Sequence, residues 1–281
     1  MRNLGYYNGE IGLIEEMKVP MTDRGFYLGD GLYDAAYTRN HIIYALDEHL
    51  DRFYAGMDTL DIPYPMPKQQ LKALLSELVK RVDDGEQFVY WQVSRGSALR
   101  FHHYPEEGTP SNLTVMLRPM PIRPVYTPVK LISAEDKRYL YCNIKTISLL
   151  PGVLTAEMAV RAGAHETVLH RGDRVTECSH TNIGMLKNGA FVTPPADEYI
   201  LAGVGRAHLM AACHALGVPV EERIFTMQEL MEADEVILTS AGSLCLSAYE
   251  LDGKVVGGKA PELLRRLQDY LMSDWLEKTA K

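Results

Sequence analysis

The sequence has few cysteines, no excess of basic residues and no long apolar run. The four cysteines lie far apart, which excludes a closely spaced zinc-ligand pair and a disulfide-rich framework. The net charge of −8 argues against a nucleic-acid partner, because phosphate binding needs a basic surface. The chain contains no run of about eighteen apolar residues, which is the length needed to cross a membrane. Its opening, MRNLGYYNGEIG, lacks the apolar core of a signal peptide. We therefore expect a cytoplasmic protein with neither a membrane nor a nucleic-acid partner.

The composition is that of a globular protein with a large core. Of the 281 residues, 46% are hydrophobic and 23% are charged, which suits one large domain or two smaller ones. Strand-like and helix-like segments alternate, and the segment PMPIRPVYTP is rich in proline, which interrupts both structures and stiffens a connector. We predict an α+β fold with an N-terminal domain (1–119), a linker (120–128) and a C-terminal domain (129–281).

Turn dipeptides and apolar periodicity predict the individual helices and strands. Asn-Gly and Asp-Gly pairs between apolar runs are strong hairpin signals, and they occur at 8–9, 188–189 and 252–253. Asp47 is placed to cap a helix, and a second helix follows Pro67. Strands are predicted at 88–96, 112–118, 129–133, 166–170, 174–193 and 236–240, and further helices near 153–163, 205–216 and 260–278.

The segment YLYCNIKTISLLPGVL, residues 139–154, contains a lone charged residue, Lys145. An amine among apolar side chains loses proton affinity through desolvation, which makes it a better nucleophile toward a carbonyl. Such a lysine suits a Schiff base with pyridoxal phosphate. The alternative is a lysine whose stem lies along apolar surface while its ammonium stays in water, and this segment alone favours that interpretation.

Glu177 lies in RVTECSHTNIG, residues 174–184, after a β-branched pair and before small polar residues. Its carboxylate could hydrogen-bond a pyridinium nitrogen and keep that nitrogen protonated, so that the ring withdraws electrons. The alternative is a glutamate in water at the end of a strand, which is the commoner environment for an isolated glutamate.

Two glycine-containing turns and one basic segment are further candidates. LAGVGRAHLMAACHALG (201–217) places glycines before an amphipathic helix, where free backbone N–H groups and the helix dipole attract phosphate, and SAGS (240–243) is a second small-residue turn. In SRGSALRFHHYP, Arg100 and His102 alternate, so an extended chain would turn both toward one carboxylate. Ordinary turns and a solvated loop are the alternatives. We predict no metal site at His102-His103, because further ligands are not nearby.

Taken together, these segments resemble the fold-type IV pyridoxal-phosphate enzymes, and most closely the bacterial D-amino acid aminotransferases. The resemblance covers almost the whole chain, with motifs in the same order and at similar spacing. These motifs are DRGFYLGDGLYD (23–34), DEHLDRFYAG (47–56), VSRGSALRFHHYP, CNIKTISLL (142–150), VTECSHTN (175–182) and ILAGVGR (200–206). The resemblance implies a small N-terminal α/β domain and a larger C-terminal domain, with the cofactor at their interface.

The resemblance also implies which residues hold the cofactor, pyridoxal 5′-phosphate. Lys145 matches the lysine that carries the cofactor and moves the substrate proton, and Glu177 matches the partner of the pyridine nitrogen. Leu201 lies where an apolar residue backs the cofactor ring. The residues that match the phosphate site are Arg52, Val204, Gly205 and Ala241.

For the substrate, the resemblance implies a D-amino acid and a 2-oxo acid, bound by a homodimer. Tyr33, Arg100 and His102 match a trap for the substrate carboxylate. In the family, the arginine and the histidine of this trap come from the neighbouring subunit.

This sequence departs from the family pattern at several positions. Asp34 stands where the family usually has glutamate, and Gly205 and Ala241 stand where the D-amino acid branch has threonines, which removes two hydroxyl contacts to phosphate. His180 replaces a small serine near Glu177. It could be a supporting hydrogen-bonding residue or could reshape the pocket, and the sequence does not decide between these roles.

We therefore predict a D-amino acid aminotransferase that works by ping-pong half-reactions. The alternatives within the fold are aminodeoxychorismate lyase, which tends to carry tyrosine where His102 stands, and branched-chain L-amino acid aminotransferase, whose key arginine lies elsewhere. An alternative of another class is a non-catalytic protein that binds pyridoxal phosphate. The presence of Arg100 and His102 favours the D-amino acid enzyme, because a mere binder needs no substrate arginine.

Overall fold

The protein is described by a computed structural model of residues 1–281, and its contacts divide it into two compact units. The first unit comprises Met1–Ile122, Ile144–Ser148 and Glu277–Lys281, and the second comprises Arg123–Asn143 and Leu149–Leu276. The first unit therefore includes two short segments that come from far along the chain. These units are defined by which residues contact one another and not by domain boundaries along the chain. The predicted domain bounds therefore stay a prediction.

The first unit is built on a six-stranded antiparallel sheet in the order β2-β1-β6-β5-β3-β4. Its strands are β1 (Leu4–Tyr7), β2 (Glu10–Gly12), β3 (Gly31–Arg39), β4 (Ile42–Ile43), β5 (Gln87–Ser94) and β6 (Asn112–Pro119). Asn8 and Gly9 turn the β1–β2 hairpin with positive φ angles, as their sequence predicts. The short helices are α1 (Arg24–Leu28), η1 (Ile14–Glu16) and η2 (Val79–Arg81).

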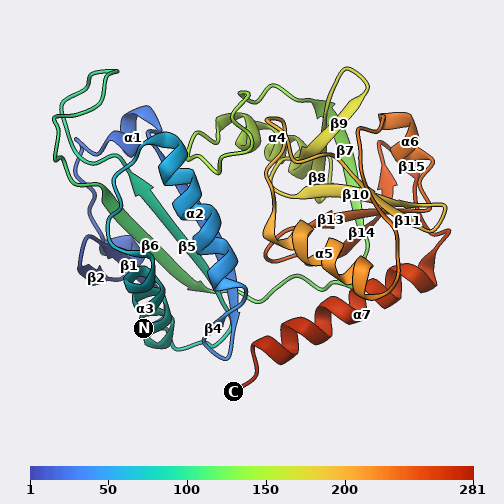
Figure 1. Ribbon diagram of the computed structural model, residues 1–281, viewed down its shortest axis with the longest axis horizontal. Coiled ribbons are helices and arrows are strands. Elements are labelled where there is room, and N and C mark those ends of the chain that lie inside the picture. The colour runs from blue at the N-terminus through green and yellow to red at the C-terminus, as the bar shows by residue number, and fades with distance from the viewer. The chain divides into compact units, whose positions relative to one another are not determined.

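Two longer helices, α2 (Leu46–Leu60) and α3 (Lys68–Leu78), lie on one face of this sheet (Figure 1). They bury an apolar core with β3 and β5 that includes Leu50, Phe53 and Trp91. Helix α3 follows Pro67, as predicted. The prediction that Asp47 caps α2 is wrong, because the N-cap is Ala45 in the left-handed conformation. Asp47 instead lies in the first turn, where its charge complements the helix dipole.

The second unit is built on a nine-stranded mixed sheet in the order β12-β11-β10-β13-β14-β7-β8-β9, with β15 paired to β14. Its strands are β7 (Val129–Glu135), β8 (Glu166–Arg171), β9 (Arg174–Cys178), β10 (Asn182–Lys187), β11 (Ala190–Thr193), β12 (Val220–Glu222), β13 (Glu235–Thr239), β14 (Leu246–Leu251) and β15 (Lys254–Val255). The predicted hairpins at 188–189 and 252–253 are confirmed. The helices are α4 (Leu150–Arg161), α5 (Val204–Ala215), α6 (Met227–Met231) and α7 (Pro261–Lys278).

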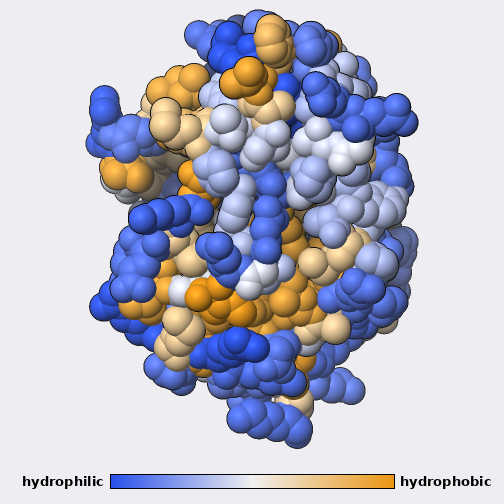
Figure 2. Space-filling view, turned by 90° about the vertical axis from the view of Figure 1, so that its left-hand side faces the viewer, coloured by the Kyte–Doolittle hydropathy of each residue, from blue (hydrophilic) through white to orange (hydrophobic).

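Helix α4 leaves an unusual number of apolar side chains exposed. It begins earlier than predicted, at Leu150, and Leu150, Val153, Leu154 and Met158 are 65%, 59%, 59% and 46% exposed. Their spacing places them on one side of the helix, and we call these four residues the α4 apolar face. Figure 2 shows that one side of the molecule also carries apolar patches among hydrophilic side chains. No helix of the protein is both long enough and apolar enough to cross a membrane.

Candidate active site

The segment that carries Lys145 is bound to the open edge of β3. Strand β4 pairs only with the far end of β3, at Thr38 and Arg39. The near end is covered by residues 144–148, because the amide of Tyr33 donates to the carbonyl of Lys145 (2.8 Å) and the amide of Ile147 donates to Gly31 (3.1 Å). The backbone of Lys145 is therefore fixed by strand-like hydrogen bonds.

The amine of Lys145 lies over an aromatic face. Its Nζ is 4.4 Å from the ring centroid of Tyr33, which stacks on Tyr90 with 5.3 Å between ring centroids. Burial, together with the neighbouring Tyr33, raises the pKa of Tyr90, so Tyr90 stays neutral. The apolar segment does not enclose Lys145 completely, because the side chain is half-buried and Leu149 and Leu150 are exposed.

Arg52 is held by a buried carboxylate on the other face of β3. Its Nε and Nη2 donate to the two oxygens of Asp34 at 2.9 and 2.7 Å, and Nδ1 of His49 lies 2.8 Å from Asp34. Burial alone would raise the pKa of Asp34, but the charge of Arg52 and the bond to His49 hold that pKa well below its usual range. Asp34 thus fixes Arg52, whose predicted contact with phosphate stays a prediction.

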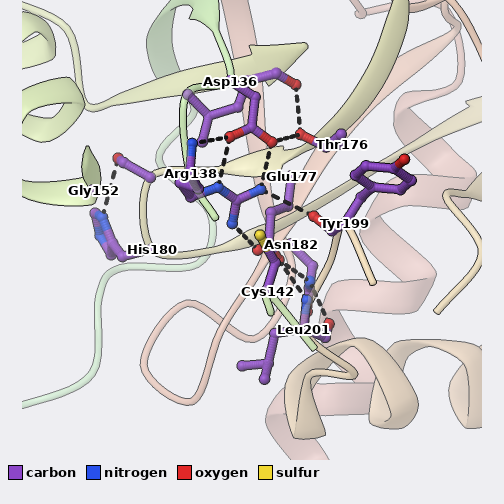
Figure 3. A network of polar contacts seen from close by, with 12 residues as sticks. Asp136, Arg138, Cys142, Gly152, Thr176, Glu177, His180, Asn182, Tyr199 and Leu201 are labelled. Atoms are coloured by element: carbon purple, nitrogen blue, oxygen red, sulfur yellow. Dashed lines mark hydrogen bonds and ion pairs between the residues drawn. The ribbon is translucent and has the colours of Figure 1, made fainter. Parts of the chain in front are cut away.

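In the second unit, Glu177 is held by three donors (Figure 3). The guanidinium of Arg138 donates to Oε1, while the side-chain amide of Asn182 and the backbone amide of Leu201 donate to Oε2 at 2.8 and 3.1 Å. The residue is only 6% exposed. A buried carboxylate with a cationic partner and further donors remains an acceptor, which suits a bond to a protonated ring nitrogen.

Arg138 is itself fixed by Asp136, which sequence reasoning missed as a partner. Its Nη2 lies 2.9 Å from Asp136, and the hydroxyl of Thr176 donates to the same carboxylate at 3.0 Å (Figure 3). Burial would raise the pKa of Asp136, but the hydrogen bonds and charge of Arg138 lower it. The signal was present as Asp-x-Arg before Lys145, since an extended chain turns alternate side chains to one face.

The predicted phosphate-site residues of this unit come together around the start of α5. The amide of Asn182 that binds Glu177 also donates to the carbonyl of Leu201 at 2.8 Å. A Cβ added at Gly205 would lie 2.8 Å from the carbonyl oxygen of Ser240, so only glycine allows the first turn of α5 to lie against the Ser240 turn. Val204 starts the helix, and Ala241 follows Ser240. Helix α5 has no acidic residue in its first turn, so its N-terminus suits an anion.

No hydrogen bond within the chain joins Arg100 or His102 to the other predicted site residues. Both are exposed on the loop between β5 and β6, which extends from the sheet in Figure 1, and neither makes a hydrogen bond or ion pair. Tyr33, the third predicted trap residue, lies on β3 beside Lys145. The loop therefore exposes the guanidinium of Arg100 and the imidazole of His102 to solvent.

A family model described as amino-transferase class IV matches residues 31–251, from β3 to β14. The chain belongs to the class IV aminotransferases. A D-alanine aminotransferase of Listeria monocytogenes serotype 4b is 35% identical over 268 residues, with 92% of each chain covered. One of Bacillus licheniformis is 34% identical over 281 residues, with 98% of each covered. A solved branched-chain amino acid aminotransferase of T.th., in complex with N-(5′-phosphopyridoxyl)-L-glutamate, has a TM-score of 0.86, 22% identity, and coverage of 97% of this chain and 94% of that one.

This class IV aminotransferase has the predicted fold, since two mixed α/β units, each with its own sheet, agree with the architecture of its structural neighbours. The match of residues 31–251 includes all the predicted site residues, from Tyr33 to Ala241. The roles of the individual residues stay predictions. Four further side chains support the predicted residues. Asp34 holds Arg52 in the first unit, and in the second unit Arg138 and Asn182 donate to Glu177 while Asp136 holds Arg138.

Proposed function

We propose that this protein is a pyridoxal-phosphate-dependent D-amino acid aminotransferase, which moves the amino group of a D-amino acid to a 2-oxo acid. The D-alanine aminotransferases that resemble it along more than nine-tenths of its length support this substrate class. The observation that carries the proposal is Lys145, whose backbone is fixed at the edge of β3 and whose amine is over Tyr33. Location in the cytoplasm stays a prediction.

The residues present fit pyridoxal phosphate. Lys145 offers an amine to the aldehyde, Glu177 offers a buried carboxylate to the ring nitrogen, and the start of α5 offers free amides to the phosphate. Gly205 leaves room for the close approach of two backbone turns that a side chain would prevent. When bound, the cofactor supplies an electron sink for the carbon that bears the substrate amine.

Each residue then has a distinct task in the proposed reaction. The freed amine of Lys145 takes the α-proton of the amino donor and returns a proton in the next step. Glu177 keeps a proton on the ring nitrogen, and Arg138 and Asn182 keep Glu177 in place. Release of the first oxo acid and binding of a second complete the ping-pong cycle.

We propose a homodimer, in which a second copy covers the α4 apolar face and receives Arg100 and His102 from its neighbour. Exposed patches of this kind usually mark contact surfaces. Leu154→Glu should therefore convert the dimer to a monomer and lower activity with D-alanine by more than about tenfold, because a charge replaces buried apolar contact. Sedimentation velocity and a D-alanine assay would measure both effects.

Val255→Glu is the matched control for this prediction. Val255 is 85% exposed on β15 and lies outside the α4 apolar face, so its charge should change neither mass nor activity. A Leu154→Glu variant that remains a fully active dimer would contradict the proposed interface.

Threonine at position 205 and threonine at position 241 should have opposite effects on the affinity for the cofactor. Gly205→Thr places a Cβ against Ser240 and should weaken cofactor binding by about tenfold or more, since overpacking costs about 1–3 kcal/mol. Ala241→Thr adds a hydroxyl and should tighten binding several-fold, because a neutral hydrogen bond contributes about 0.5–1.5 kcal/mol. Titration of the cofactor-free protein with pyridoxal phosphate measures both. Unchanged affinity in Ala241→Thr would mean that the backbone amides and Arg52 already satisfy the phosphate.

One assay tests the proposed function as a whole. Purified protein is given D-alanine or L-leucine with 2-oxoglutarate, and the new oxo acid and the configuration of the glutamate are measured. We expect turnover of D-alanine with D-glutamate as product. Preference for L-leucine would favour the branched-chain alternative, and cofactor binding without turnover of either would favour a non-catalytic binding protein.

A further inference from the structure

A tight turn, residues 178–181, connects the two side chains that meet at the predicted ring-nitrogen site. The amide of Cys178 donates to the carbonyl of Thr181 at 2.8 Å. Glu177 precedes the turn on β9 and Asn182 follows it on β10, and their side chains are joined by a 2.8 Å hydrogen bond. The shape of the turn therefore determines whether Glu177 and Asn182 meet.

The turn is held by hydrogen bonds to Glu166, a fully buried carboxylate at the start of β8. It accepts from the hydroxyl of Ser179 (2.9 Å), the amide of His180 (2.7 Å) and the hydroxyl of Thr181 (2.9 Å). Nδ1 of His180 lies 2.8 Å from the same carboxylate. All four contacts come from three consecutive residues of the turn.

His180 is the ion-pair partner of Glu166. Burial would raise the pKa of Glu166, but the charge and hydrogen bonds of His180 outweigh it and lower that pKa. Two other titratable groups, His165 and Cys178, lie near this ion pair, and both favour their uncharged forms. Burial, with the charge of Arg123, lowers the pKa of His165, and burial, with the charge of Glu166, raises the pKa of the Cys178 thiol.

The imidazole of His180 also reaches the surface. Its side chain is 54% exposed and, in Figure 3, points toward Gly152 in the first turn of α4. The carbonyl of Ser179 lies 3.2 Å from the position of a Cβ on Gly152, so the turn packs closely on α4. His180 thus links a buried carboxylate to solvent.

We propose that His180 is a positioning residue: its imidazolium neutralises Glu166 and thereby keeps the 178–181 turn in the shape that joins Glu177 to Asn182. Loss of the imidazolium proton removes the ionic part of the contact and leaves a neutral hydrogen bond. The buried charge of Glu166 is then supported by neutral donors alone, which is a costlier arrangement. This inference rests on the proposed function, and it decides between the two roles that the sequence leaves open for His180.

The affinity of the cofactor-free protein for pyridoxal phosphate, measured from about pH 5.5 to 8.5, tests the proposal because an imidazole titrates in that range. His180→Gln keeps a neutral donor and should bind about three- to tenfold more weakly than wild type at the acidic end. The ratio of the two affinities should approach one at the basic end. In Glu166→Gln/His180→Gln no buried charge needs neutralisation, so the double variant should bind more tightly than His180→Gln at the acidic end.

His170→Gln is the matched control, since His170 lies on the same strand as Glu166 but binds Gly172 instead. It should match wild type at every pH. A ratio for His180→Gln that is constant across the pH range would overturn the proposal and leave a structural role alone. If His180→Gln does not fold, Glu166→Gln is compared with the double variant: both lack the carboxylate, so the ratio of their affinities should stay constant across the pH range, and a ratio that changes with pH would overturn the proposal. Absence of cofactor binding by the wild-type protein would instead overturn the proposed function.

Discussion

Lys145→Ala should abolish turnover of D-alanine while the protein remains folded. Proton transfer by a positioned side chain contributes about 10²- to 10⁴-fold, and the variant also loses the amine that holds the cofactor. The backbone bonds of residue 145 to β3 do not depend on its side chain, and the contact with Tyr33 contributes only about 0.5–1 kcal/mol. We therefore expect a rate at least about a thousandfold lower, with little change in melting temperature.

The measurements are a single-turnover assay, the absorbance of the bound cofactor and thermal unfolding. Lys137→Ala is the matched control, because Lys137 is an exposed lysine eight residues earlier in the sequence that pairs with Glu135. It should retain full activity and the absorbance band. Near-normal transamination by Lys145→Ala would show that another amine does the chemistry.

Arg100→Ala should lower the catalytic efficiency with D-alanine by about ten- to a hundredfold. A charge-assisted hydrogen bond contributes about 1.5–3 kcal/mol, and about 1.4 kcal/mol corresponds to one decade. If Arg100, His102 and Tyr33 fix the carboxylate on one side, the side chain must take the other, and only the D-isomer turns its α-hydrogen toward Lys145. The loss should be small for a primary amine that lacks a carboxylate.

Stability should not change in Arg100→Ala, because Arg100 is exposed and makes no hydrogen bond within the chain. His103→Ala is the matched control on the same loop: His103 stacks on Phe101 and is outside the predicted trap. His102→Ala should act in the same direction as Arg100→Ala but more weakly, since its charge depends on pH. Undiminished D-alanine activity in Arg100→Ala, or a wild-type preference for L-alanine, would place the trap elsewhere.

Much of the fold could be predicted because its signals are local. At Asn8-Gly9 and Asn188-Gly189, two residues with positive φ suffice to turn a hairpin, and the dipeptide itself carries that information. The attachment of residues 144–148 to β3 could not be predicted in this way. It depends on β4 being too short to cover the whole edge of β3, which is a property of the assembled sheet.

The candidate site divides along the same line. The resemblance of several motifs to one family indicated Lys145 and Glu177, whereas each segment taken alone favoured a solvated side chain. The partners of Glu177 were harder to find, since Arg138 and Asn182 come from different segments and meet only when the strands pair. The prediction that Asp47 caps α2 was wrong because Ala45 adopts a left-handed conformation, which alanine rarely does and which the sequence therefore does not indicate.

The attachment of Lys145 to β3 makes the reaction depend on strand register. Side chains alternate along an extended segment, so Ile144 is buried near Gly56 of α2 while Lys145 turns to Tyr33. Insertion or deletion of one residue just before Lys145 would exchange these positions and put the amine where Ile144 packs. The length of the chain that leads to this lysine is therefore under as strict a constraint as the lysine itself.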